Sequence, residues 1–222
     1  MRDPVLSRSN RRARQRRFVR AGIVAALAIA AAGVGVSLIG GSSDPADEAS
    51  TPVVAFEATI SGEGDSKPSD EAVQTEGQKI VELLDEWYQQ AFVDPEKFGD
   101  GTFPEVAATF DEAARIAFAE DVDALTIGPA REEVERIEPT TATATITVFF
   151  EKGKTPTWAT AAVSFAATAT LKDETAPPVG IDQTVTLFLR RTDEGWLVST
   201  YYDAHQEQRS IEASPSPSGS PA

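Results

Sequence analysis

The chain contains no cysteine and a single histidine, His205, among its 222 residues. Without cysteine there is no disulfide framework, so stability must come from an ordinary hydrophobic core. One histidine and no thiolate leave too few ligands for a zinc site. The sequence also lacks a P-loop, a dinucleotide-binding glycine motif, G-x-S-x-G and HExxH, which removes several common enzyme classes. We therefore expect no cofactor and no metal ion.

Positive charge is scarce outside the first 20 residues. That segment holds eight arginines and one aspartate, a net charge of +7, whereas residues 21–222 hold 12 basic and 34 acidic residues, a net charge of −22. An acidic surface repels phosphate backbones, which argues against a nucleic-acid partner. The basic segment has a simpler topological explanation.

No charged residue occurs from Ala21 to Gly41. This run of 21 residues has about the length needed to cross a bilayer as a helix. Because positive flanks stay in the cytoplasm, we predict a basic cytoplasmic stub (1–20), one transmembrane helix (21–41) and an extracytoplasmic remainder. The expected location is the cell membrane, with a single pass.

Two features of this segment leave alternatives open. A basic stretch before an apolar one also occurs in cleaved signal peptides, and small residues follow at Gly41-Ser42, although the apolar run exceeds the usual signal-peptide length. Small residues at four-residue spacing, Gly22, Ala26 and Ala30, let two such helices approach closely. A homodimer is therefore one expectation.

The outer part divides by composition into three segments. Residues 42–74 are rich in Ser, Gly, Pro, Asp and Glu and predict a flexible acidic linker. An apolar interruption at 51–60 (TPVVAFEATI) fits either a short strand or a docking segment. Residues 209–222 predict a disordered Ser/Pro tail. Residues 75–208 have the size of one domain.

Helical patterns open this domain. Thr75 and Gln78 match a capping box, and apolar residues follow at helical spacing until Asp94-Pro95. Two further capping-box patterns start at Thr102 and Thr109 and predict two short helices over 103–121.

Strand patterns follow. Residues 141–148, 158–171 and 183–191 alternate apolar and polar side chains, and 196–205 continues after a tight turn, which together predict an antiparallel sheet. Residues 133–138 fit an additional first strand. Helices followed by a meander of strands indicate an α+β fold.

A helix carrying Trp87-Tyr88, two short helices and curved strands ending in GWLVSTYYDA together resemble the nuclear transport factor 2-like (SnoaL-like) superfamily. The resemblance implies a cone-shaped sheet around the first helix and makes Trp87 and Tyr88 candidates for lining a pocket. With its topology, the chain also resembles actinobacterial Mce-associated membrane proteins. The layout is similar to that of the periplasmic bridging component of type IV secretion systems. These resemblances imply protein partners in the cell envelope.

A possible proton-transfer site lies near the end of the last strand. Alternation puts Tyr201, Asp203 and His205 on one face, where a histidine base, a carboxylate and a phenol are suitable groups for proton transfer. The same alternation puts Trp196 and Val198 on the opposite face. If that opposite face is the core, the three polar residues face water.

The segment from Asp94 to Glu105 resembles a calcium-binding loop in part. Counted from Asp94, positions 6, 9 and 12 carry EF-hand residue types, but position 5 is Phe98, which has no side-chain oxygen. A glycine-rich turn with helix caps explains the same residues without a metal ion.

Two functions remain open from the sequence. The first is a non-catalytic interaction or assembly domain of a bacterial envelope complex. The alternative is a small-molecule-binding or isomerase/cyclase-like domain that uses the cone cavity. A cone filled by Trp87, Phe149, Phe165 and Phe188 argues for the first function.

Overall fold

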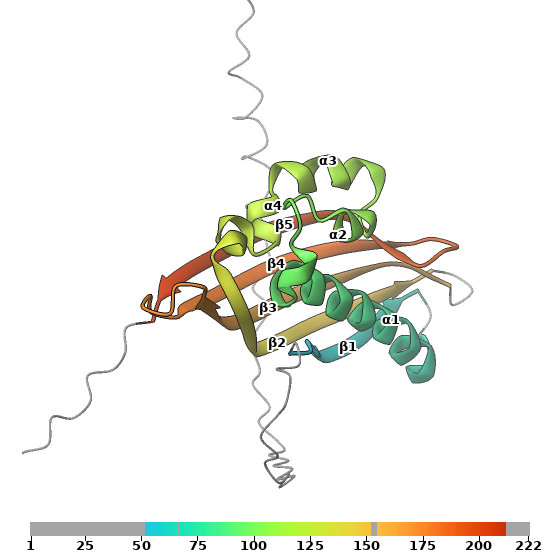
Figure 1. Cartoon of the computed structure of the whole chain (residues 1–222). Helices are drawn as coiled ribbons and strands as arrows, with labels where there is room; N and C mark the ends of the chain where they lie inside the picture. The colour runs from blue at the N-terminus through green and yellow to red at the C-terminus, as the bar shows by residue number, and fades with distance from the viewer. Residues whose placement is uncertain (1–51, 66, 152–154, 212–222) are drawn as a thin grey trace, which may run out of the picture. The chain divides into compact units, whose positions relative to one another are not determined.

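A computed structural model describes residues 52–65, 67–151 and 155–211. The predicted stub and transmembrane helix lie outside these residues, as does most of the predicted tail. No helix within the described ranges is long and apolar enough to span a bilayer. The described part is α+β, with helices packed against a five-stranded mixed sheet (Figure 1).

The sheet has the strand order β1-β2-β3-β4-β5. Strands β2 (Val134–Phe150), β3 (Pro156–Leu171), β4 (Val179–Arg191) and β5 (Trp196–Ser210) pair antiparallel in sequence order. The predicted extra strand at 133–138 belongs to β2, which continues past an irregularity at Pro139/Thr141. The meander was predicted correctly, apart from these boundaries.

Strand β1 (Glu57–Gly64) pairs parallel with β2 and makes the sheet mixed, whereas the sequence predicted an antiparallel one. The linker predicted over 42–74 is therefore wrong for this stretch. Helix α1 fixes the chain just before β1, because Asp85 Oδ1 accepts from the Phe56 amide at 2.8 Å and Gln89 Oε1 accepts from the Val54 amide at 3.0 Å.

Helix α1 (Asp70–Tyr88) begins five residues before the predicted capping box. Ser69 is the N-cap, and its hydroxyl accepts from the Ala72 amide at 3.3 Å. A π-helical turn, Gln89–Val93, continues α1 to Asp94, where the sequence predicted the end. The buried side of α1 presents a regular apolar stripe, made of Val73, Gly77, Ile80, Val81, Leu84, Trp87 and Tyr88.

Short helices follow α1: the 3-10 turn Pro95–Lys97, α2 (Pro104–Ala108), α3 (Glu112–Glu120), α4 (Val122–Leu125) and the 3-10 turn Gly128–Glu132. The two helices predicted over 103–121 are confirmed, but their predicted caps are wrong. Phe103, with φ of 47°, precedes α2, and the Asp111 carboxylate caps α3 by accepting from the Ala114 amide at 3.0 Å.

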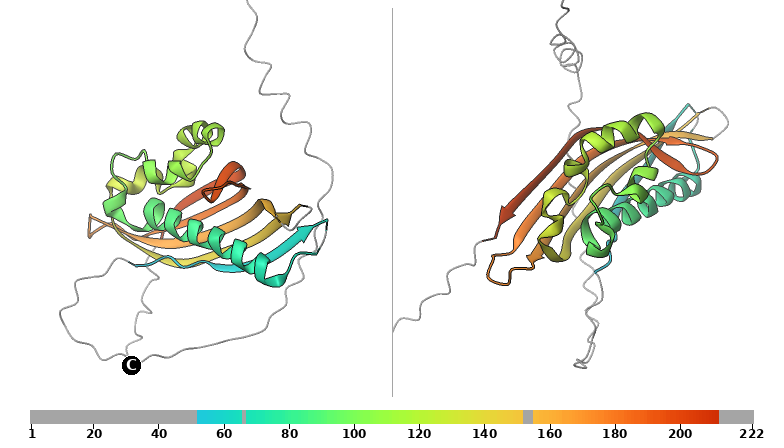
Figure 2. Two further views of the ribbon diagram at one scale, coloured as in Figure 1. Left: turned by 90° about the vertical axis from the view of Figure 1, so that its right-hand side faces the viewer. Right: turned by 45° about the horizontal axis from the view of Figure 1, so that its top comes forward.

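All the helices lie on one side of the sheet, as the left view of Figure 2 shows. Along β3 and β4 every second residue is buried against them. The intervening residues form the opposite side, on which no described element packs. The fold thus has a covered face and an open face.

Candidate interaction face

Two β-bulges in β5 separate the predicted proton-transfer residues. The pairing with β4 advances one residue on β4 for two on β5 near Ser199, and two residues on β4 for three on β5 near Asp203. Each bulge reverses the alternation of side chains along the strand. Tyr201 therefore lies half-buried toward the helices, whereas His205 is exposed on the other side. Asp203 is exposed, with φ of 53°.

The Tyr201 side chain contacts the helical layer and not a histidine. Its hydroxyl donates to Asp121 Oδ2 at 2.9 Å, and its ring lies edge-on to Phe110 at 6.1 Å. Burial and the Asp121 carboxylate raise the pKa of Tyr201 above its ordinary value. This phenol therefore stays neutral and holds β5 against the residue that precedes α4. The predicted constellation is not assembled.

Trp87 and Tyr88 are core residues. Both are at most 1% exposed. The Trp87 indole donates to the Leu125 carbonyl at 3.2 Å, and the Tyr88 hydroxyl donates to Oε1 of Gln183. Burial raises the pKa of Tyr88 above its ordinary range. Nε2 of Gln183 has no hydrogen-bond partner among the described residues.

Aromatic side chains fill the space between the sheet and the helices. Tyr88 stacks on Phe92 with 5.0 Å between the ring centroids, and its ring centroid lies 5.1 Å from that of Phe165. Trp87 lies edge-on to Phe110, also with 5.1 Å between the centroids. Trp87 and Phe165 are therefore two of the four side chains whose packing inside the cone argues for the first function.

Phe149 and Phe188, the other two side chains whose packing inside the cone would have argued for the first function, lie on the opposite side of the sheet. They follow the outward alternation of β2 and β4 and are only partly buried.

The loop from Asp94 to Glu105 is organised by its own turns. Asp94 Oδ1 accepts from the Glu96 amide at 3.1 Å, and Asp100 Oδ1 accepts from both the amide and the hydroxyl of Thr102. Phe98 is buried. No group of three or more metal-ligating residues occurs within the described ranges. Turn formation and capping explain this loop.

On the open face, residues that pair with one another across neighbouring strands form rows that run across the sheet. Its two central rows contain only hydroxyl, aromatic and small apolar side chains: Ser61, Thr147, Thr160, Phe188 and Thr200 in one, and Thr59, Thr145, Ala162, Thr186 and Tyr202 in the next. None of these ten residues is charged, although a quarter of the chain is. Charges lie in the rows on either side of these two, at Glu57, Glu63, Asp182, Arg190 and Glu207.

One end of the open face is aromatic. Phe149 and Trp158 pair across β2 and β3 and stack at 3.7 Å with an interplanar angle of 4°. Phe188 lies edge-on to Tyr202 at 5.3 Å. Trp158 is 43% exposed and Tyr202 is 56% exposed. An uncharged centre with exposed aromatic anchors and a charged rim is typical of a protein interface.

The aromatic cluster was only partly visible in the sequence. Trp158 is exposed near the start of β3, and Phe149 and Tyr202 were missed as surface residues. Phe149 could have been predicted on the open face, because it continues the alternate positions of β2 that carry Thr143, Thr145 and Thr147. The position of Tyr202 on the open face could be predicted only with knowledge of the two bulges in β5.

A hollow lies on the helical side, between α1, α2 and the start of β5. It has a volume of about 600 Å³ and is open to solvent. Its walls carry Glu82, Glu86 and Glu105, and its floor includes Trp87 and Trp196.

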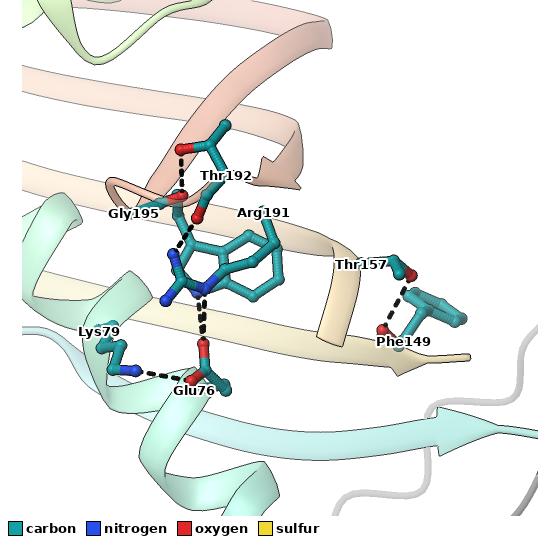
Figure 3. A network of polar contacts seen from close by, with 8 residues as sticks. Glu76, Lys79, Phe149, Thr157, Arg191, Thr192 and Gly195 are labelled. Carbon is teal, nitrogen blue, oxygen red and sulfur yellow. Dashed lines mark hydrogen bonds and ion pairs between the residues drawn. The ribbon is translucent and has the colours of Figure 1, made fainter. Parts of the chain in front are cut away.

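The Trp196 indole beside this hollow is held by Glu76, which Figure 3 shows with Lys79 and Arg191. Glu76 Oε2 accepts from Trp196 Nε1 at 3.1 Å and from Arg191 Nε at 3.2 Å, and Oε1 accepts from Lys79 at 2.6 Å. Burial raises the pKa of Glu76, but the Lys79 hydrogen bond and the Lys79 and Arg191 charges outweigh it and hold the pKa below 4.5. Glu76 thus joins α1 to the β4–β5 hairpin.

Comparison with known proteins adds no family. No family model, no curated protein and no solved structure matches the chain. The geometry alone supports the function considered next.

Proposed function

We propose that this chain is a membrane-anchored, extracytoplasmic assembly domain of a bacterial envelope complex and that it has no catalytic activity. The single observation that carries the proposal is the open face, with its uncharged centre and its exposed aromatic end. Water-exposed aromatic side chains in such a setting gain most when a partner covers them. The anchor and orientation come from the charge pattern of residues 1–41.

The packing of the helical side also supports assembly over chemistry. A small-molecule or isomerase/cyclase-like domain needs space and titratable groups between the helices and the sheet. Here Trp87, Phe92, Phe110 and Phe165 are at most 1% exposed in that layer. The hollow that carries Glu82, Glu86 and Glu105 is open to solvent and does not reach into this packed layer. His205 is on the opposite side of the sheet from Tyr201. The expected nuclear transport factor 2-like architecture remains part of this proposal, with its cone serving as a core.

The assembly function predicts contacts with other envelope proteins. A photo-reactive residue placed at Trp158 on the open face, or at Glu86 beside the helical hollow, is activated in intact cells that carry the full chain. We expect a covalent adduct with another envelope protein from at least one position. A residue placed at Glu174, in the exposed turn between β3 and β4, is the control.

Adducts are identified by mass spectrometry after purification from membranes. Recovery of nothing but the chain itself from both positions contradicts the assembly function. A fractionation in which the chain is found in the cytoplasm contradicts the proposed topology.

A further inference from the structure

We propose that the open face binds the open face of a second copy of this chain, around a two-fold axis that runs across the strands along the row containing Ala162. This inference rests on the proposed assembly function and names one partner for its interaction face. It follows from the size of the face, from the order of large and small residues along it, and from the position of its charges.

The face is large enough for a stable contact. Five strands about 4.8 Å apart and five rows about 7 Å apart span an area of roughly 700 Å². A standard protein interface buries about 800 Å² on each partner. The Ala162 row carries no charge, and of the two rows beside it only one has a charged residue, Glu57 on the edge strand. No ionised group therefore needs to be stripped of water at the middle of the contact.

A two-fold axis along the Ala162 row exchanges the rows on its two sides. On β3 the face reads Trp158, Thr160, Ala162, Ser164 and Ala166 in order. The axis therefore places the Trp158 end of one copy over the Ala166 end of the other. Large side chains meet small ones at both ends of the contact, which lets the two faces approach closely.

The same exchange applies on β2, where Phe149 and Thr141 occupy the two outer rows. An isologous interface makes each such contact twice. The aromatic end of each copy is then covered by the threonine- and alanine-rich end of the other.

Charge follows the same arrangement. Arg190 lies in the aromatic outer row, 3.8 Å from Asp111 Oδ2. Asp182 and Glu207 pair with each other in the opposite outer row, where Arg209 contacts both and compensates one of their two negative charges. The strands of two packed sheets cross at about 30°. A residue in an outer row of one copy is therefore displaced by about one strand spacing relative to the strands of the other copy. Arg190 of each copy then faces Asp182 when it is not displaced and Glu207 when it is displaced toward β5. Opposite charges at the rim fix register more than they add affinity.

An axis parallel to the strands is the competing arrangement. It would leave every row opposite itself, with Trp158 over its own copy and the acidic row over the acidic row. Like charges in contact destabilise such a pairing. The two arrangements differ in the partner of Arg190, and a charge exchange separates them.

The test uses the full chain in detergent micelles, with its association state measured by sedimentation velocity. One variant carries Arg190→Glu, and the other carries Asp182→Arg together with Glu207→Arg. In the proposed dimer each variant alone places like charges opposite each other, so we expect the dissociation constant to rise at least tenfold. In an equimolar mixture opposite charges meet again at both ends, and dimers should return.

Glu174→Arg is the control for charge change, because this residue is exposed in a turn outside the face, and it should dimerise like the parent. Far-ultraviolet circular dichroism checks that each variant folds. A monomeric parent chain at tens of micromolar overturns the proposal, as does a mixture that stays monomeric while its two components are folded. Either result leaves the assembly function standing if adducts with other envelope proteins are found.

Discussion

The two faces of one sheet differ in what their aromatic side chains do. On the covered face, Tyr88, Phe92 and Phe165 contact one another within 5.3 Å and are at most 1% exposed. On the open face, Phe149 and Trp158 stack equally well, yet Trp158 is 43% exposed. The same residue types thus build a core on one side and a surface on the other. An aromatic side chain such as Tyr88, which the sequence made a candidate for lining a pocket, can therefore be part of the core instead.

The largest expected effect comes from a matched pair of phenylalanine truncations on neighbouring strands. Phe165→Ala removes a fully buried ring and should lower the free energy of unfolding by about 3–5 kcal/mol. Phe188→Ala on the open face removes a partly covered ring and should cost about 1 kcal/mol. Urea denaturation followed by circular dichroism measures both. Equal losses would break the distinction between the faces.

A matched pair of glycine substitutions gives the next largest effect. A Cβ at Gly77 on α1 would lie 2.3 Å from Ile60 Cγ2 of β1, whereas a Cβ at Gly180 meets nothing closer than 3.7 Å. Gly77→Ala should cost a net ~1–2 kcal/mol, because overpacking exceeds the gain in helix propensity. Gly180→Ala should be neutral within about 0.5 kcal/mol. Thermal unfolding of the two variants checks this, and a stable Gly77→Ala would show that α1 packs loosely.

The helix caps show why boundaries were harder to predict than elements. Ser69, Phe103 and Asp111 precede the helices, whereas the sequence placed the caps at Thr75, Thr102 and Thr109. A capping-box pattern is local, and several positions satisfy it. The start of each helix is decided by which turn can bury its apolar side against the sheet.

The cap of α1 allows a smaller test on the covered face. Ser69→Ala removes the acceptor for the Ala72 amide and should lower the free energy of unfolding by about 1 kcal/mol. Thr75→Ala, at the cap predicted from sequence, should change it by less than about 0.5 kcal/mol. Urea denaturation of the two variants side by side distinguishes them. A larger loss at Thr75 would contradict the observed start of α1.

Non-local pairing explains most of the rest that the sequence did not predict. The alternation in β2, β3 and β4 was sufficient to assign the meander, because each strand buries every second residue. Strand β1 was obscured by its Ser-, Gly- and Asp-rich surroundings, and its parallel partner β2 lies about 85 residues away in the pairing of Ile60 with Ile146. The bulges at Ser199 and Asp203 leave no periodic signal, so the site expected at Tyr201 and His205 was wrong.

The smallest expected effect concerns pH and the Glu76 network. Its folded-state pKa lies below 4.5, so folding favours the carboxylate. The stabilising contribution is complete above the unfolded-state pKa and is lost as the pH falls through the lower folded-state value. Melting temperatures of the parent chain and of Glu76→Gln should differ at pH 7 and converge toward pH 3. A constant difference would show that the network's charge contributes nothing.

The central claim is that the open face is the contact surface. Because the chain has no cysteine, a single introduced thiol reports one position. Ala162→Cys lies at the centre of the open face, and Ile116→Cys lies on α3, where Ile116 is 68% exposed. Treatment of cell membranes carrying each variant with a short bismaleimide should yield a covalent dimer from position 162 and none from position 116. Equal cross-linking at both positions, or none at position 162, would contradict the account.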